Sequence, residues 1–223
     1  MFRKVLPALG LLGLLGLGAC AAPGGEEDRE RFIVFPDQSV AIDLAETDLT
    51  LPLTSPLEIS EVRERISEGQ VFENIYTFHH VKGYIRTARV VFGHYSRNTS
   101  RRLRSLHEFQ DYARDLSLPP GGALTLGRMG RFEDDNRETL GFYAQAAAAP
   151  YHSNCFVARV GYLLVEYASI ERESESVDTI IDVLLCGKLP SEAEMLTFLG
   201  NLRAVENREA YRQELSRRPI GTI

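Results

Sequence analysis

The sequence predicts an α+β protein, a single domain in which several helices pack on an antiparallel β-sheet. Segments rich in β-branched and aromatic residues recur from residue 71 to residue 185, which is typical of strands. Capping-box patterns at Ser105 and Ser191 predict helices between and after these strands. Runs of strands separated from helices, rather than strict strand–helix alternation, favour an antiparallel sheet.

The composition is that of an ordinary globular domain. The chain has 223 residues, of which 44% are hydrophobic and 25% charged, which excludes collagen-like, coiled-coil and wholly disordered proteins. Only residues 5–18 form a strongly apolar uncharged run, so a multi-span membrane protein is excluded as well. The net charge of −6 argues against a nucleic-acid-binding protein.

The first elements are predicted from short local patterns. An apolar run at residues 32–35 and an alternating one at 39–44 predict two strands. Ser55, Pro56 and Glu58 give an N-cap, a first-turn proline and a capping-box acid, which predict a helix over residues 56–67.

The central region predicts a hairpin, a helix and two further strands. Residues 71–78 and 84–95 form the hairpin, with Lys82 and Gly83 between its strands. A helix is predicted over residues 105–116, because apolar residues recur on one of its faces. Strands are predicted over residues 123–132 and 138–146.

The last part of the chain gives one strong strand signal, one ambiguous segment and two helices. Residues 156–170 have the strongest β signal, whereas residues 177–185 are compatible with either a helix or a buried strand. Ser191 opens a helix, and residues 206–223 form a polar tail on the surface whose helix extends to about Arg218.

The amino terminus indicates export. Arg3 and Lys4 precede the apolar run, which is shorter than the roughly 20 residues that cross a bilayer. The run ends in Leu17-Gly18-Ala19-Cys20, which resembles the lipobox of bacterial lipoprotein precursors: a leucine, two small residues and a cysteine. The resemblance implies that residues 1–19 are a signal peptide that is removed, and that Cys20 carries acyl chains such as palmitate. The alternative is a soluble exported protein cut near Ala19 or Ala22.

The same resemblance predicts where the mature protein lies. Ala21 stands where an aspartate would favour inner-membrane retention in that family, which implies an anchor in the outer membrane with the domain facing the periplasm. Residues 20–31 contain glycine, proline and six consecutive charges and are expected to be a flexible tether, followed by the domain at residues 32–223. Loss of Arg3 and Lys4 changes the net charge from −6 to −8.

Cysteine usage agrees with an envelope protein. Cys155 and Cys186 remain after Cys20, and two thiols in an oxidising compartment favour a disulfide. Two free buried thiols or a redox pair are the alternatives, although no C-x-x-C motif is present.

One segment concentrates positive charge and is the candidate binding surface. Residues 74–107 contain seven cations and no Asp or Glu. Its densest group is predicted to bind an anionic envelope polymer or a protein partner through guanidinium forks, and comprises Arg97, Arg101, Arg102 and Arg104. The alternative is neutralisation within the fold by the acidic residues between Glu166 and Asp178.

Histidines are abundant in the same segment but do not predict a metal site. His79 and His80 are adjacent in a strand pattern and would face opposite sides of a sheet. His107 begins a pattern similar to the helical H-E-x-x-H zinc motif, but Asp111 replaces the second histidine. No nucleotide or nucleophile motif is present either, so no metal, cofactor or catalytic residue is assigned.

The sequence therefore predicts a membrane-anchored envelope lipoprotein that is non-catalytic and contacts an anionic component or a protein. It contacts the bilayer through acylated Cys20 and is not expected to bind nucleic acid. The alternative is an envelope enzyme, hydrolytic or metal-dependent, with its site near the histidine-rich hairpin at residues 76–107.

Overall fold

A computed structural model describes residues 39–50, 57–67, 71–90, 95–116, 123–134, 139–148, 152–164 and 177–217. Several expectations lie outside these residues: the signal peptide, Cys20 and the tether, the strand at 32–35, and most of the acidic stretch between Glu166 and Asp178. No helix in the described part of the chain is long and apolar enough to cross a membrane.

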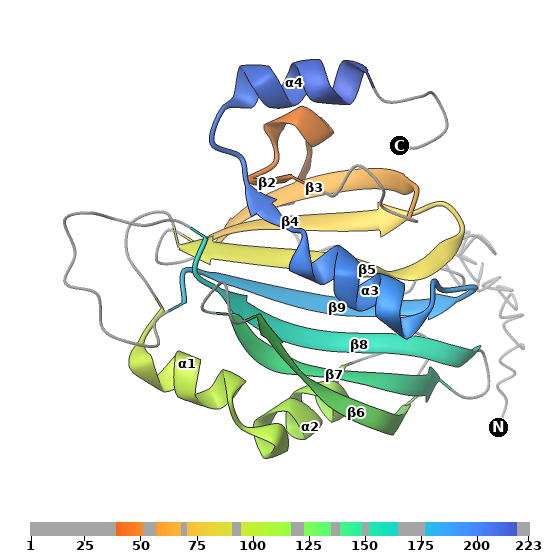
Figure 1. Cartoon of the computed structure of the whole chain (residues 1–223). Helices are drawn as coiled ribbons and strands as arrows, with labels where there is room; N and C mark the ends of the chain where they lie inside the picture. The colour runs from red at the N-terminus through yellow and green to blue at the C-terminus, as the bar shows by residue number, and fades with distance from the viewer. Residues whose placement is uncertain are drawn as a thin grey trace, which may run out of the picture.

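An eight-stranded antiparallel sheet dominates the described residues (Figure 1). Its order from edge to edge is β1-β3-β4-β5-β9-β8-β7-β6. The strands are β1 Val40–Ala41, β3 Ile59–Ser67, β4 Val71–Phe78, β5 Val81–Val90, β9 Thr179–Gly187, β8 His152–Tyr162, β7 Thr139–Ala148 and β6 Leu124–Asp134. The antiparallel sheet with helices is therefore confirmed as the fold class.

Helices and a small second sheet complete the described chain. The helices are α1 Arg97–Leu103, α2 Leu106–Asp115, α3 Glu192–Gly200 and α4 Arg208–Ser216, with a short 3-10 helix η2 at Leu44–Glu46. Strands β2 Leu49–Thr50 and β10 Arg203–Ala204 pair with each other apart from the main sheet. The helices predicted at residue 105 and at Ser191 are confirmed, the latter with both hydrogen bonds of its capping box.

The helix predicted over residues 56–67 is wrong: this segment is strand β3. Capping and the Glu61–Arg65 spacing are local effects worth a few tenths of a kcal/mol to about 1 kcal/mol each. Strand pairing with β4 extends without interruption from Glu61 to Ser67 and supplies hydrogen-bond partners along the shared edge of the two segments. Val62 faces the core while Arg63 and Arg65 take the other side, and this alternation fits a strand.

Two further strand boundaries differ from the sequence prediction. The strand predicted at residues 39–44 is reduced to Val40–Ala41, because Asp43 caps η2 and the chain turns. The hairpin of β4 and β5 is confirmed, but it turns at His79 and His80, and Gly83 lies inside β5. Gly83 has φ 118°, and a Cβ there would lie 1.9 Å from the carbonyl oxygen of Leu184 on β9, so only glycine fits this close approach.

The ambiguous segment at residues 177–185 is strand β9, which lies at the centre of the sheet between β5 and β8. From Thr179 to Cys186 every residue is buried, because helices cover both faces of the sheet at this point. A strand covered on both faces shows no alternation of polar and apolar residues, which explains why periodicity could not assign it. Strand β8 is confirmed, although it begins and ends earlier than residues 156–170.

Two apolar layers form, one on each face of the sheet. Ile181, Val183 and Leu185 of β9 pack with Met195, Phe198 and Leu199 of α3, which crosses in front of β9 and β8 in Figure 1. Leu184 packs on the opposite face with Phe109 and Ala113 of α2. Tyr211 and Leu215 attach α4 to Ala45 of η2 in a separate cluster.

Cys155 and Cys186 stand opposite each other on β8 and β9, and their sulfur atoms are bonded at 2.01 Å. The bond lies within the layer that α2 covers. It links two neighbouring central strands that are separated by a long connection in the sequence, namely residues 163–178.

Candidate functional site

A pocket of about 520 Å³ lies between the α1–α2 pair and one face of the sheet. Strands β4, β5, β9 and β8 form its floor, and α1 and α2 form its wall and mouth. The volume is in the range of small-molecule sites. Its floor carries charged residues, which are unusual on buried sheet faces and need partners.

Three of these charged residues form one row across the sheet. Arg86 on β5, Asp182 on β9 and Arg159 on β8 are directly opposite one another in the strand register. The Asp182 side chain is 1% exposed and the two arginines are about one third exposed, at 34% and 32%. The register therefore places one buried carboxylate between two half-buried guanidinium groups.

The two arginines are held differently. Arg86 donates from Nε at 3.2 Å and from Nη2 to the same oxygen, Oδ2 of Asp182. Nε of Arg159 lies 3.5 Å from Oδ1 of Asp182, which is a salt-bridge distance. Oδ1 accepts no hydrogen bond, and Arg159 donates none to any described residue. Arg86 is therefore fixed by Asp182, whereas Arg159 is held only by charge attraction.

Electrostatics keep Arg86 charged. Burial alone would lower its pKa, but the negative charge of Asp182 and the hydrogen bonds to it raise the pKa above the ordinary value. A permanently charged Arg86 balances the single charge of Asp182. The charge of Arg159 is then in excess at the β8 end of the row.

Tyr112 of α2 orients Arg159. The guanidinium carbon of Arg159 lies 4.4 Å from the centre of the Tyr112 ring, which is a cation–π contact. This contact does not use the N–H donors at the edge of the guanidinium, which are left for other contacts. The Tyr112 hydroxyl is buried and has no hydrogen-bond partner among the described residues.

The tyrosines around the row remain protonated at neutral pH. Burial and the charge of Asp182 raise the pKa of Tyr112 well above its ordinary value. Burial, with the charges of Glu73 and Asp182, raises the pKa of Tyr95 to about 12. The Tyr95 hydroxyl donates to the carbonyl oxygen of Ala88 at 3.0 Å, whereas the Tyr112 hydroxyl, which adjoins Tyr84, makes no hydrogen bond of normal geometry to a described residue.

A second ion pair adjoins the row on the same face. Arg65 of β3 donates to Glu73 of β4 at 2.7 Å, and Glu73 is 7% exposed. The floor and its edge thus contain three guanidinium groups, from Arg65, Arg86 and Arg159, and two carboxylates. One positive charge is in excess, and the arginine with the weakest contact is Arg159.

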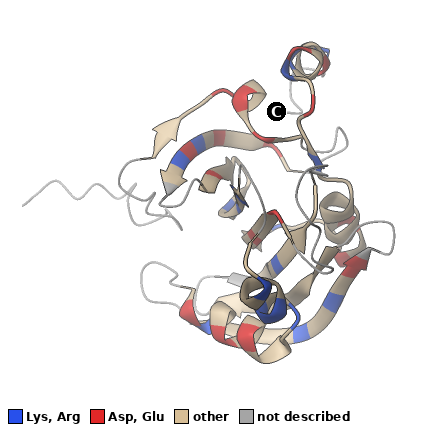
Figure 2. Ribbon diagram, turned by 90° about the vertical axis from the view of Figure 1, so that its left-hand side faces the viewer, with Lys and Arg blue, Asp and Glu red and all other residues tan. Residues whose placement is uncertain are grey.

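Acidic residues of α2 lie at the mouth. Glu108 accepts from Arg102 at 3.0 Å and Asp111 from Arg114 at 2.5 Å. Asp115 lines the pocket and has no ion-pair partner among the described residues. Figure 2 shows the basic segments of α1 and the acidic segments of α2 close together at the foot of the molecule. The mouth therefore carries a single excess negative charge.

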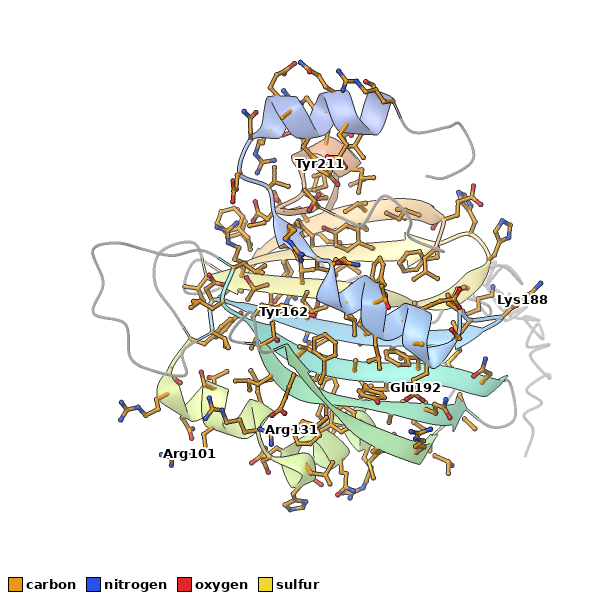
Figure 3. The ribbon with its side chains drawn as sticks, in the orientation of Figure 1. Arg101, Arg131, Tyr162, Lys188, Glu192 and Tyr211 are labelled. Atoms are coloured by element: carbon orange, nitrogen blue, oxygen red, sulfur yellow. A yellow bond between two sulfur atoms is a disulfide. The ribbon has the colours of Figure 1, made fainter. Side chains whose placement is uncertain are left out.

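The structure divides the arginines predicted to bind an anion. Arg102 lines the pocket and is paired with Glu108. Arg101 is exposed, has no ion-pair partner among the described residues, and points away from the sheet in Figure 3. Arg97 is exposed on α1, and Arg104 is its half-buried C-cap; both have further contacts within the chain. These four residues thus belong to one short helix whose inner side reaches the pocket.

Neutralisation within the fold is found for two arginines of residues 74–107, and the acids are not those of the predicted stretch. Arg102 forms an ion pair with Glu108 of α2, and Arg86 forms one with Asp182 of β9. The acidic residues between 165 and 176 lie outside the described residues, and Asp178 accepts from the backbone N–H of Leu164 and the hydroxyl of Thr179.

The described histidines lie at separate places. His79 and His80 are exposed in the β4–β5 turn, where His80 is 3.1 Å from Glu58. His107 lies on the outer side of α2, 3.5 Å from Asp111. In the described part of the chain no group of three or more His, Cys, Asp or Glu has metal-site geometry. His94 and the side chains of His152 and Ser153 lie outside what the structure describes.

Sequence reasoning did not identify the residues that form the floor of the pocket. In the sequence, Arg159 belongs to a predicted strand, Asp182 to the ambiguous segment at residues 177–185, and Tyr112 to a predicted helix. A charged residue within an otherwise apolar strand, as Asp182 is in β9, was the available signal, because a buried charge requires a partner.

Comparisons with known proteins add no relative: no family model, no curated protein and no solved structure matches the chain.

Proposed function

We propose that this chain is a lipid-anchored protein of the bacterial envelope that binds an anionic ligand in the pocket between α1–α2 and the sheet, without catalysing a reaction on it. The observation that carries the proposal is Arg159. Its guanidinium lines the pocket, donates no hydrogen bond to a described residue, and is the excess charge of the floor. A bound anion would gain charge-assisted hydrogen bonds without breaking any that the protein already makes.

The anchor is proposed from the amino-terminal pattern. Cys20 follows a lipobox-like Leu-Gly-Ala and would carry the acyl chains, with residues 21–31 as a tether to a single domain at residues 32–223. Ala21 favours the outer membrane and a domain that faces the periplasm. Each buried methylene of an acyl chain contributes about 0.8 kcal/mol, so the domain needs no membrane-binding surface of its own.

The basic residues of α1 support the proposal from outside the pocket. Arg102 and Thr99 line it, and Arg97 and Arg101 lie on the same short helix with exposed side chains. Positive charge near a pocket raises the local concentration of anions and their rate of entry. We therefore assign Arg97, Arg101, Arg102 and Arg104 the role of attracting the ligand, and Arg159 the role of holding it.

Native mass spectrometry of the protein extracted from its own membranes tests both parts. The protein should begin at an acylated Cys20 and carry a small anionic compound. The bound compound should disappear in Arg159→Gln and persist in Arg131→Gln. Arg131 is the matched control, because it lies on the same face in β6, paired with Glu133 at 2.7 Å and outside the pocket.

The two parts fail separately. A free amino terminus at another residue, without acyl mass, overturns the anchor and leaves the pocket proposal in place. An acylated protein with no anionic compound, or with one that survives Arg159→Gln, overturns the pocket proposal.

A further inference from the structure

We infer that the ligand is an amphipathic monocarboxylate, with its carboxylate on Arg159 and its apolar body against the apolar part of the pocket lining, which includes Leu103, Phe109 and Ile180. This inference rests on the proposed function and specifies the chemical class that the site takes.

The charge balance limits the ligand to one negative charge. The floor has one excess positive charge, at Arg159, after Arg65 pairs with Glu73 and Arg86 with Asp182. The mouth has one excess negative charge, at Asp115. A monoanion would be attracted by Arg159 and only weakly repelled by Asp115. A phosphate dianion would be repelled twice as strongly by Asp115, and it would still find only one unpaired guanidinium to bind.

The geometry around Arg159 fits a carboxylate. The guanidinium carbon of Arg159 lies 4.4 Å from the centre of the Tyr112 ring, and the edge of a guanidinium presents parallel N–H donors that match a carboxylate. The Tyr112 hydroxyl is buried, makes no hydrogen bond of normal geometry to a described residue, remains protonated, and can donate to a ligand oxygen. A carboxylate would supply the missing acceptor for Arg159 and Tyr112.

Five apolar residues form one part of the lining, beside the charged residues of the mouth, and this part would hold the ligand body. Leu103 of α1, Phe109 of α2 and Ile180 of β9 line the pocket and are at most 5% exposed. Val71 and Ala88 continue this surface on β4 and β5. Apolar atoms placed there leave water, and each methylene buried gives about a fourfold gain in affinity.

Calorimetric titration with octanoate tests the inference. The protein used is the mature chain with Cys20→Ser, which carries no acyl chains and therefore needs no detergent. It is exported during expression so that its disulfide forms. Octanoate should bind at least tenfold more tightly than 1-octanol, which lacks the charge, and than acetate, which lacks the body. Affinity should rise about fourfold per methylene from butyrate to octanoate until the wall is covered. Octyl phosphate should bind more weakly than octanoate.

Two variants locate the site. Arg159→Gln should weaken octanoate binding at least tenfold and leave 1-octanol unchanged, while Arg131→Gln should match the wild type. If Arg159→Gln unfolds, as circular dichroism would show, Arg159→Lys keeps the charge without the fork and should weaken binding by a smaller factor.

The outcomes separate this inference from the proposed function. Equal affinity for octanoate and octanol, no dependence on chain length, or tighter binding of octyl phosphate overturns the monocarboxylate. If an anion of another class still depends on Arg159, the proposed function stands. If no anion binds and none is extracted with the protein, both are overturned.

Discussion

Arg86 and Asp182 face each other on neighbouring strands, and two nitrogens of the arginine donate to one oxygen of the aspartate. The two side chains differ in their access to water, since Arg86 is 34% exposed and Asp182 only 1%. Loss of Asp182 leaves Arg86 unpaired but able to recover hydration, whereas loss of Arg86 leaves a buried carboxylate whose remaining ionic contact is Arg159 at 3.5 Å. The cost of breaking the pair should therefore depend on which partner is removed.

Arg86→Gln should lower the free energy of unfolding by about 3–5 kcal/mol, and Asp182→Asn by about 2–3 kcal/mol. The first change removes the hydrogen bonds of a buried carboxylate and leaves it only the ionic contact with Arg159, and the second leaves unpaired a guanidinium that reaches the pocket. Urea unfolding at pH 7 measures both. The double variant Arg86→Met with Asp182→Leu should recover much of the loss, and equal costs for the two single variants would contradict the argument from exposure.

Gly83→Ala should destabilise the protein by more than about 2 kcal/mol, because alanine is strained at φ 118° and its Cβ would lie 1.9 Å from the Leu184 carbonyl oxygen. Gly187→Ala is the matched control: its φ is 120°, but nothing lies within 4 Å of an added Cβ. It should cost about 1–2 kcal/mol from backbone strain alone. Thermal unfolding of the two variants separates the cost of backbone strain from the cost of the clash with Leu184. Similar losses of stability would show that β9 moves away from the added Cβ at little cost.

Elements that are specified by a local sequence pattern could be predicted from the sequence. The hairpin of β4 and β5, the helix α2 and the capping box of Ser191 follow from composition and spacing within about 20 residues. Strand β3 is predicted as a helix because capping residues and i,i+4 spacing are local patterns, whereas its pairing with β4 is a contact that these patterns do not include. Strand β9 stayed ambiguous because burial on both faces removes periodicity.

The candidate site was less accessible from the sequence, for a geometric reason. Arg86, Arg159 and Asp182 meet only because β5, β9 and β8 are neighbours in a particular register. Register across a sheet depends on packing and on turns, and a shift by one residue would place all three side chains on the other face. The arginines of α1 were visible because they are adjacent in the sequence, yet only Arg102 of this group lies opposite the row in the pocket.

Replacing both Cys155 and Cys186 with alanine should lower the free energy of unfolding by about 3.5 kcal/mol, the chain-entropy value for a loop with a sequence separation of 31. The β8–β9 pairing itself should persist, because the register extends through Tyr162 and Thr179. Urea unfolding of the oxidised, reduced and double-alanine proteins measures the loss. Thiol titration of the unfolded wild type before reduction must find no free thiol at these positions, and finding two would show that the bond is not formed.

Tyr95 should contribute to a loss of stability at alkaline pH. Its pKa in the folded protein is about 12, above the ordinary value of 10, so the folded state holds a proton that the unfolded chain releases. The contribution is complete below pH 10 and disappears as the pH rises from 10 to 12. Tyr95→Phe should cost about 1 kcal/mol at pH 7 for the lost hydrogen bond to Ala88, and should make the alkaline decline shallower. Parallel declines for variant and wild type would contradict this.

Arg101 and Lys188 provide a matched test of whether α1 attracts anions. Both are exposed and without an ion-pair partner among the described residues, and Figure 3 shows them at opposite sides of the molecule. Attraction between the α1 arginines and anionic liposomes or lipopolysaccharide should be screened over about 8 Å at physiological ionic strength, so binding weakens as salt rises. Arg101→Ser should reduce co-sedimentation of the unlipidated protein at low salt, and Lys188→Ser, which removes the same charge far from α1, should not. Adding Arg102→Ser should reduce co-sedimentation further, because this change removes a second positive charge and also leaves Glu108 unpaired at the mouth of the pocket. The same loss for Arg101→Ser and Lys188→Ser would mean that only net charge matters, and no loss for either would remove the role assigned to α1.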